Sequence, residues 1–486
     1  MRKALLCFAA ALTLLAAAGC SGSDAPVVVT PEPVTALART VTAEELRSLA
    51  AEYPDLKELD LRGSDCPAEI TAFIAAHPDI AVTYDVDLGG VRAAGDTTAL
   101  TIDEGTYRFD VLAENLAYLP ALEQLALPRT ALSAAQLRQL REAYPALALR
   151  CTVELLGTEI DSDAAELDLT ALTESDVDVA AAAIEKLPDV ARIALGDLPL
   201  AAAKTIRAAA PDAALDYTFE LFGQTVSADA ERLEYYEAPI GNEGIAEVRD
   251  MLDVMNGLTY LNLEKCGVDS EVMAQLRDDY PETKIVWRVY FGDYFSCLTD
   301  EEMIRAIFKL HDDDVSELKY CTDVKYMDIG HNDELHDISF IAYMPKLEIC
   351  ILSGSPTTDL SPFANCPELE FLECVYCCYI PNVDALENCT KLKYLNLSYS
   401  QVKDLSPLYD LPLERFMYYD SGLSDADQQA MRDAHPDCWV TFSGLNPYVL
   451  GWRYDDQGYT WCDMYKHVRE VFNYSENYYN HEEPRG

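Results

Sequence analysis

The last third of the chain contains five similar segments that follow one another at nearly equal spacing. They share an apolar position, which is occupied by Met327, Cys350, Leu372, Leu395 and Phe416, at steps of 23, 22, 23 and 21 residues. A fixed period of this length is typical of a solenoid, in which each repeat buries its apolar residues against the repeats before and after it. Such a fold offers an extended surface, so the pattern indicates binding more than catalysis.

A longer repeating unit precedes the short repeats. Its central strand cores begin at Leu59, Leu125, Ile193 and Leu261, which are 66, 68 and 68 residues apart. Each core is followed by a helical stretch that ends in proline, and then by an alternating strand that ends in a glycine turn. A third strand opens the next unit, so the units contain one strand per about 22 residues, the pitch of the short repeats. We therefore expect one continuous solenoid over about residues 45–445.

The short repeats resemble a known family. The pattern L-x-x-L-x-L, followed after a short loop by Asp-Leu-Ser-Pro at residues 359–362 and 404–407, resembles the leucine-rich repeats of internalin-type bacterial surface proteins. The long unit is similar to the upstream part of leucine-rich-repeat bacterial lipoproteins. This resemblance implies an α/β leucine-rich-repeat solenoid, with parallel strands on its concave face and helices and turns on its convex face. The chain departs from the family pattern where Met327 and Cys350 replace leucines and where Ser, Gly or Tyr replaces the asparagine after the strand.

The N-terminus has the features of an export signal. Arg2 and Lys3 precede an apolar run at residues 4–18, which is too short for a comfortable transmembrane helix. Small residues then lead to Cys20, an arrangement that resembles the lipobox of bacterial lipoproteins, with Ala17 in place of the usual leucine. The resemblance implies that Cys20 is acylated and becomes the first mature residue; a soluble secreted protein cut nearby is the alternative. We expect a lipid anchor on the outer face of a bacterial membrane, and no other membrane attachment.

These patterns divide the chain into six regions. A lipoprotein signal peptide is followed by a flexible tether rich in Pro, Val and Thr, and the two kinds of repeat are separated by a helical transition. The predicted boundaries are 1–20 for the signal peptide, 21–44 for the tether, 45–298 for the long units, 299–323 for the transition, 324–443 for the short repeats and 444–486 for an aromatic C-terminal cap.

Charge and cysteine content restrict the classes of partner. The chain has 84 acidic and 36 basic residues and a formal charge of −48, which argues against nucleic acid and anionic head groups as partners. Of the 15 cysteines, Cys7 leaves with the signal and Cys20 takes the lipid, so an odd number remains. Cys321, Cys366 and Cys389 occupy one repeat position, which predicts a buried column of small apolar side chains. A bridge between Cys366 and Cys389 is the alternative.

The concave face of the short repeats supplies the candidate ligand-binding residues. In each strand the residues on either side of the inward leucine point outward, and neighbouring strands lie about 4.8 Å apart. Outward apolar side chains should therefore form an exposed stripe flanked by charges, as at protein-binding surfaces. The alternative is that these side chains stiffen the sheet or are covered by the C-terminal tail. The predicted residues are Tyr326, Asp328, Ile349, Ile351, Phe371, Glu373, Tyr394, Asn396, Arg415, Met417 and Tyr419.

After Gly444 the repeats end and the chain becomes rich in aromatic residues. One amphipathic helix near Asp463 to Phe472 is predicted there, and it would cover the open end of the solenoid. The alternative is an aromatic platform that stacks on sugar rings, for which Trp452 and Trp461 are the candidates.

No catalytic motif appears in the sequence. The run His-Asn-Asp-Glu-Leu-His at residues 331–336 is neither a zinc-protease motif nor its inverse, and nucleophile elbow, P-loop and dinucleotide fingerprints are lacking. We therefore predict a protein without enzymatic activity, cofactor or metal, which binds an unidentified protein or peptide through its concave face. A glycan-binding envelope component is the second hypothesis, and an enzyme with a site assembled across repeats is the third. The sequence leaves the oligomeric state open.

Overall fold

A computed structural model of the chain describes residues 33–103, 107–443, 452–454 and 460–474. The chain forms two compact units, Met1–Val153 and Glu154–Gly486. The predicted signal peptide, its lipidated Cys20 and most of the tether lie outside the described residues. None of the helices within the described ranges is long and apolar enough to cross a membrane.

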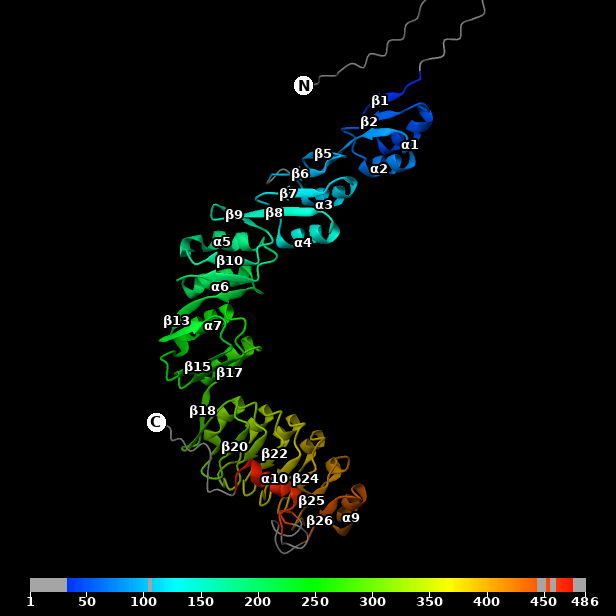
Figure 1. Ribbon diagram of the computed structural model, residues 1–486. Coiled ribbons are helices and arrows are strands. Elements are labelled where there is room, and N and C mark those ends of the chain that lie inside the picture. Colours follow the sequence, from blue (N-terminus) through cyan, green and yellow to red (C-terminus); the bar gives the residue numbers. More distant parts are fainter. Residues whose placement is uncertain (1–32, 104–106, 444–451, 455–459, 475–486) are drawn as a thin grey trace, which may run out of the picture. The chain divides into compact units, whose positions relative to one another are not determined.

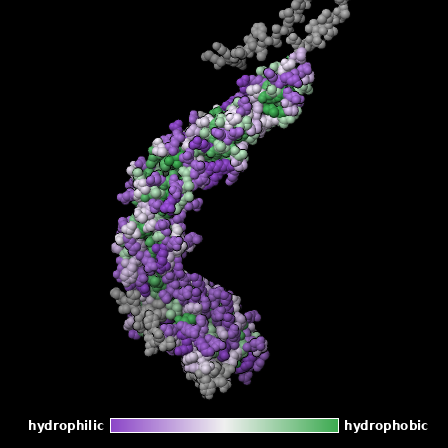
Figure 2. Space-filling model, in the orientation of Figure 1, coloured by the Kyte–Doolittle hydropathy of each residue, from purple (hydrophilic) through white to green (hydrophobic). Residues whose placement is uncertain are grey.

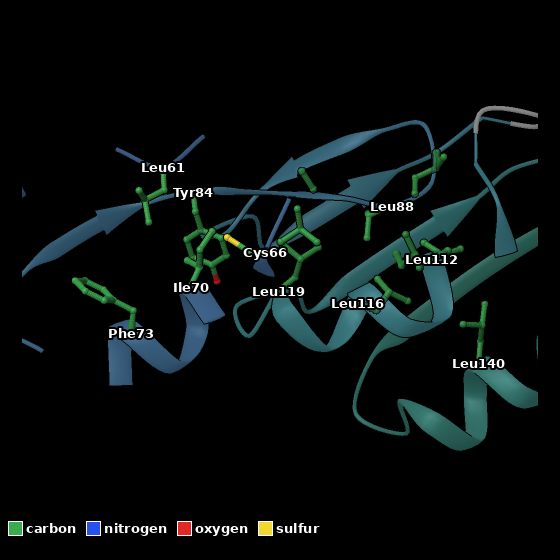
Figure 3. Close-up of a cluster of buried hydrophobic side chains, with 14 of the residues drawn as sticks. Leu61, Cys66, Ile70, Phe73, Tyr84, Leu88, Leu112, Leu116, Leu119 and Leu140 are labelled. Atoms are coloured by element: carbon green, nitrogen blue, oxygen red, sulfur yellow. The ribbon is translucent and has the colours of Figure 1, made fainter. Parts of the chain in front are cut away.

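The first unit contains short parallel strands that alternate with helices (Figure 1). Its core lies between them: in Figure 3, Ile70, Phe73 and Leu112 project from the helices toward Leu61 and Leu88 on the strand side. Its strands are β1 (Ala36–Ala38), β2 (Glu58–Asp60), β3 (Ala81–Thr83), β4 (Asp85–Asp87), β5 (Arg92–Ala94), β6 (Ala99–Thr101), β7 (Gln124–Leu127) and β8 (Ala148–Leu155). Its α-helices are α1 (Ala43–Glu52), α2 (Pro67–Ala76), α3 (Phe109–Asn115) and α4 (Ala134–Ala143).

The start of the folded region differs from the predicted boundary. Strand β1 and the beginning of α1 lie within residues 21–44, which were expected to be a tether. The Thr42 side chain accepts a hydrogen bond from the backbone N–H of Glu45, and the Glu45 carboxylate accepts one from the backbone N–H of Thr42. This capping box fixes the first turn of α1, so the folded chain begins upstream of residue 45.

The long units continue into the second unit. In each, the predicted central strand lies between two parallel neighbours, with Ile193 in β11 and Leu261 in β16. The strands are β9 (Thr158–Asp161), β10 (Glu166–Leu169), β11 (Arg192–Leu195), β12 (Ala214–Asp216), β13 (Thr218–Leu221), β14 (Gln224–Ser227), β15 (Arg232–Tyr236), β16 (Tyr260–Glu264), β17 (Lys284–Val286), β18 (Arg288–Phe291) and β19 (Phe295–Leu298). The helices are α5 (Val177–Ile184), α6 (Leu200–Ala209), α7 (Ile245–Val254) and α8 (Ser270–Asp279).

The alternating strands of the long units differ from the prediction, because three of them break in two. The breaks fall at Tyr84, Tyr217 and Trp287, which are all buried. Beyond each break the chain leaves the parallel sheet and forms an antiparallel hairpin, β4–β5, β13–β14 or β18–β19. In β13–β14 the turn residues Phe222 and Gly223 both have positive φ, which is the backbone of a type I′ turn. The parallel sheets are therefore separated by hairpins.

The short repeats form one seven-stranded parallel sheet in sequence order. Its strands are β20 (Met303–Arg305), β21 (Tyr326–Asp328), β22 (Ile349–Ile351), β23 (Phe371–Glu373), β24 (Tyr394–Asn396), β25 (Arg415–Met417) and β26 (Trp439–Thr441). The convex side has 3-10 helices, η4 (Asp312–Asp314), η5 (Ser316–Tyr320), η6 (Ser339–Tyr343), η7 (Ser361–Asn365), η8 (Asp384–Asn388) and η9 (Ser406–Leu408), and one α-helix, α9 (Asp425–Ala434). The expected helical transition at 299–323 instead contains β20, η4 and η5.

The inward side chains of this sheet form a complete core. Met327, Cys350, Leu372, Leu395 and Phe416, the residues on which the repeats align, are fully buried and adjacent in register. Parallel strands one repeat apart, with their apolar residues inward and turns on the convex side, make this region a leucine-rich-repeat solenoid of the α/β class. In the view of Figure 2, hydrophilic side chains cover most of the visible face of the short repeats.

The repeat cysteines lie where the sequence predicts. Cys321, Cys366 and Cys389 are fully buried, and every cysteine in the described ranges has a free thiol. The Cys389 thiol donates to the carbonyl oxygen of Phe363 at 3.3 Å. Burial raises the pKa of Cys366 and of Cys389 to about 12, so both are neutral, apolar side chains in the core.

Candidate functional site: the covered concave face

The predicted register of the concave face is confirmed by the strand pairing. Tyr326, Ile349, Phe371, Tyr394 and Arg415 are neighbours in one outward row of the sheet, with Met303 and Trp439 at its ends. A second row runs beside it and contains most of the polar residues. This second row consists of Arg305, Asp328, Ile351, Glu373, Asn396, Met417 and Thr441.

The prediction that this stripe is exposed is wrong. The C-terminal segment, which we define as the described residues between 452 and 474, lies across the concave face, as the alternative interpretation expected. In Figure 1 its helix α10 (Asp463–Val471) lies beside β20 and β22. Among the predicted residues, the buried ones are Asp328, Ile349, Ile351, Phe371, Glu373, Asn396 and Met417, and the half-buried ones are Tyr326, Tyr394, Arg415 and Tyr419.

Apolar contacts join the C-terminal segment to the first row. Trp452 is 2% exposed and packs on Phe371, with ring centroids 5.4 Å apart. Val468 of α10 and Phe472, which directly follows the helix, join the same buried cluster. The cluster extends from Met303 in β20 to Trp439 in β26, so the described part of the segment crosses the concave face.

Glu373 is the centre of the polar contacts, and its side chain is 0% exposed. Its carboxylate accepts hydrogen bonds from Trp452 Nε1 at 2.5 Å and from Arg453 Nη2 at 2.6 Å. From the sheet itself, Ser353 Oγ donates at 3.0 Å. A buried carboxylate requires such partners, and here a cation and an indole from the C-terminal segment provide two of the three.

Asp328, two strands from Glu373, forms a second polar contact with the C-terminal segment. The phenol of Tyr474 donates to one carboxylate oxygen, and the backbone N–H of Gly330 donates to the other at 3.2 Å. Burial raises the pKa of Asp328 above its ordinary value, although these hydrogen bonds and the charge of Arg305 oppose the shift. Arg305 also contacts the C-terminal segment. Its Nη1 donates to the carbonyl oxygen of Phe472 at 3.4 Å, and its guanidinium lies over the Tyr474 ring.

The two tryptophans of the glycan hypothesis are not an open platform in this structure. Trp452 is buried against the sheet, and its N–H is bonded to Glu373. Trp461 is half-buried and stacks with Tyr454 at 4.0 Å between ring centroids and with Tyr465 at 5.6 Å, while Arg469 lies over its ring. Rings in these contacts are not free to stack on a sugar, so the geometry gives this alternative no support.

Sequence reasoning missed several residues that form this site. Arg305, Arg453, Tyr465 and Tyr474 were not predicted, although each contacts the concave face or the segment on it. A signal was present in the sequence: two acidic residues, two repeats apart, point outward from the strands, and an aromatic tail with an arginine follows the last repeat. These two features indicate complementary charge between the tail and the concave face, but they do not specify the individual contacts.

The remaining polar groups do not form a metal site. Among the described residues, no group of three or more His, Cys, Asp or Glu side chains is placed to hold a metal ion. In the run at residues 331–336, His336 lies beside Asp312 and Glu334 lies beside His311, as separate pairs.

Comparisons with known proteins found similarity to solved structures alone. No family model matches the chain, and no curated protein matches its sequence. An internalin C2 of Listeria monocytogenes is 19% identical over 30% of this chain and 72% of its own, with a TM-score of 0.22. An internalin of the same species, InlF, is 17% identical over 74% and 86%, with a TM-score of 0.27. A leucine-rich-repeat protein of Leptospira interrogans is 14% identical over 81% and 91%, with a TM-score of 0.25.

Proposed function

We propose that this chain is a non-enzymatic leucine-rich-repeat scaffold that binds a protein or peptide on the concave face of its short repeats. We further propose that it is held on the outer face of a bacterial membrane through a lipid on Cys20. The observation that carries the binding proposal is that this face already holds a polypeptide segment, through the buried cluster around Phe371 and the hydrogen bonds to Glu373.

The separation between the solenoid core and the concave face supports this function. The inward residues are fully buried within the sheet and its convex turns, so the repeats have their own core without the outward row. The two outward rows nevertheless contain Ile349, Phe371 and Met417, which are large apolar side chains. Large apolar side chains on the open face of a solenoid are typical of a surface that receives another segment.

Capture of a partner by the mature chain tests the proposal. Envelope and environmental extracts are cross-linked to wild-type protein, to the double variant Phe371→Ala with Tyr394→Ala, and to a control variant with Tyr236→Ala and Tyr343→Ala. The control removes two tyrosines outside the seven-stranded sheet, Tyr236 in β15 and Tyr343 in η6, which are 58% and 55% exposed. We expect capture by wild type and control and its loss in the Phe371/Tyr394 variant. Unchanged capture by that variant, with a wild-type melting transition, contradicts the proposal.

A further inference from the structure

The buried carboxylates of the concave face indicate which kind of segment it recognises. Asp328 and Glu373 are 4% and 0% exposed, and the second row contains one buried guanidinium, that of Arg305, which is the neighbour of Asp328. Burying two carboxylates costs stability unless donors and cations satisfy them, and apolar residues of similar size are often at least as stable in such positions. A concave face whose only role was to pack against a permanently bound segment would not need these two carboxylates.

The donors that satisfy these carboxylates come largely from the C-terminal segment. It contributes the Trp452 indole N–H and the Arg453 guanidinium to Glu373, and the Tyr474 hydroxyl to Asp328. Without the segment, both carboxylates would face solvent and carry more negative charge than the neighbouring Arg305 balances. That open face is complementary to a segment that presents an arginine and aromatic hydrogen-bond donors.

The segment is organised as a docked peptide more than as a further repeat. Tyr454 and Trp461 form an antiparallel bridge, and the Cys462 N–H donates to the carbonyl oxygen of Arg453 at 3.0 Å. The nine-residue helix α10 follows, and a helix of this length is only marginally stable alone in water. Its apolar side lies on the sheet, which is the arrangement of an amphipathic helix bound in a groove.

Resting on the proposed function, we propose that the concave face recognises peptide segments that place an arginine beside an aromatic donor against Glu373 and Asp328, and that the C-terminal segment is an internal competitor for this ligand. An external ligand can bind only those molecules in which the face is open. A tethered competitor therefore raises the apparent dissociation constant of the ligand, which equals the intrinsic constant divided by the open fraction. The face would then be occupied by default, and only a ligand with matching chemistry would displace the segment.

Binding of a peptide in trans tests this inference on the full mature chain. The probe is a fluorescein-labelled synthetic peptide with the sequence of residues 452–474, and its affinity is measured by fluorescence anisotropy. Because Arg453→Ala removes the charged contact of the internal competitor, we expect the probe to bind this variant about tenfold more tightly than wild type. A probe that itself carries Arg453→Ala is expected to bind the variant about tenfold more weakly.

Two controls make the result specific. Lys466→Ala removes one positive charge from the same segment, but Lys466 pairs with the exposed Asp463, so this variant is expected to bind the probe as wild type does. Glu373→Gln, added to Arg453→Ala, is expected to cancel the gain in affinity. Equal affinities for wild type, Arg453→Ala and Lys466→Ala, or no binding to any of them, overturn the inference. Loss of partner capture by the Phe371/Tyr394 variant would still uphold the proposed function in that case, so the two failures are distinguishable.

Discussion

At the scale of single residues, Asp328 links the concave face to pH. Burial raises its pKa in the folded chain above the value of about 3.9 that it has when exposed. The folded state therefore binds a proton more readily than the unfolded state. The resulting stability is fully present below about pH 3.9 and is lost as the pH rises through the raised pKa.

The variant Asp328→Asn tests this linkage, because it keeps the shape of the side chain and removes its charge. We expect the urea midpoint of wild type to fall, relative to that of the variant, as the pH rises from about 4 to 7. Wild type and variant share the other ionisable groups that act on Asp328, which are Tyr474, Arg305 and Glu373. A constant difference between the two midpoints across this range would show that Asp328 does not titrate as inferred.

The cysteines give a second prediction at the residue scale. Cys378 is exposed, whereas Cys366 and Cys389 are fully buried thiols with pKa values of about 12. Because the thiolate is the reactive form, iodoacetamide at pH 8 should alkylate Cys378 well before either buried cysteine in native protein. Peptide mass spectrometry after short exposures measures the order. Equal rates at Cys378 and Cys366 would contradict the buried column.

At the scale of elements, neighbouring residues of β23 separate the roles of its two faces. Phe371 points outward and contacts Trp452, whereas Leu372 points into the solenoid core. Leu372→Ala should destabilise the repeats by about 2–5 kcal/mol, as expected for a buried leucine in a well-packed core. Phe371→Ala should mainly loosen the C-terminal segment.

Limited proteolysis distinguishes these two outcomes. Trypsin cleavage after Arg453, Lys466 and Arg469 is expected to be faster in Phe371→Ala than in wild type, because a segment that opens locally is cut without unfolding of the repeats. Leu372→Ala should lower the urea midpoint and leave the order of cleavage sites unchanged. Slow cleavage of the segment in Phe371→Ala would show that Phe371 does not hold it.

Elements with a local sequence signal could be predicted, and long-range contacts could not. The inward positions from Met327 to Phe416 follow from the repeat period, and the helix expected at 463–472 is observed as Asp463–Val471. The hairpins that separate the parallel sheets were missed, and in β13–β14 the turn has Phe222 before Gly223 in place of the usual Asn or Asp. The cover over the concave face joins residues 79 and 146 positions apart, and no periodicity specifies such a pairing.

At the scale of the whole molecule, the proposed lipid anchor gives a prediction outside the described residues. A bacterium that expresses the chain with its own N-terminus should incorporate an alkyne fatty acid into wild type. Cys20→Ser should lose the label and leave the membrane fraction, because the acylated residue is gone. Cys7→Ser, within the predicted signal peptide, is the matched control and should remain labelled on the mature protein. Labelling of Cys20→Ser to the wild-type level would contradict the anchor.

The charge of the whole chain bears on what the concave face can attract. A formal charge of −48 creates a field that favours the approach of positively charged segments and disfavours acidic ones. At short range, the positively charged Arg453 likewise contacts the negatively charged Glu373. Both scales therefore favour a basic, aromatic ligand for the face that the C-terminal segment covers.

Hydrogen exchange of the full mature chain tests most directly whether the C-terminal segment is a displaceable occupant of the concave face. We expect the amides of α10 to exchange through a local opening, faster than those of β22, β23 and β24, and faster still in Arg453→Ala while the strand amides keep their protection. If α10 instead exchanges only together with these strands, in wild type and variant alike, the segment is an integral part of the fold and the concave face is not a binding surface.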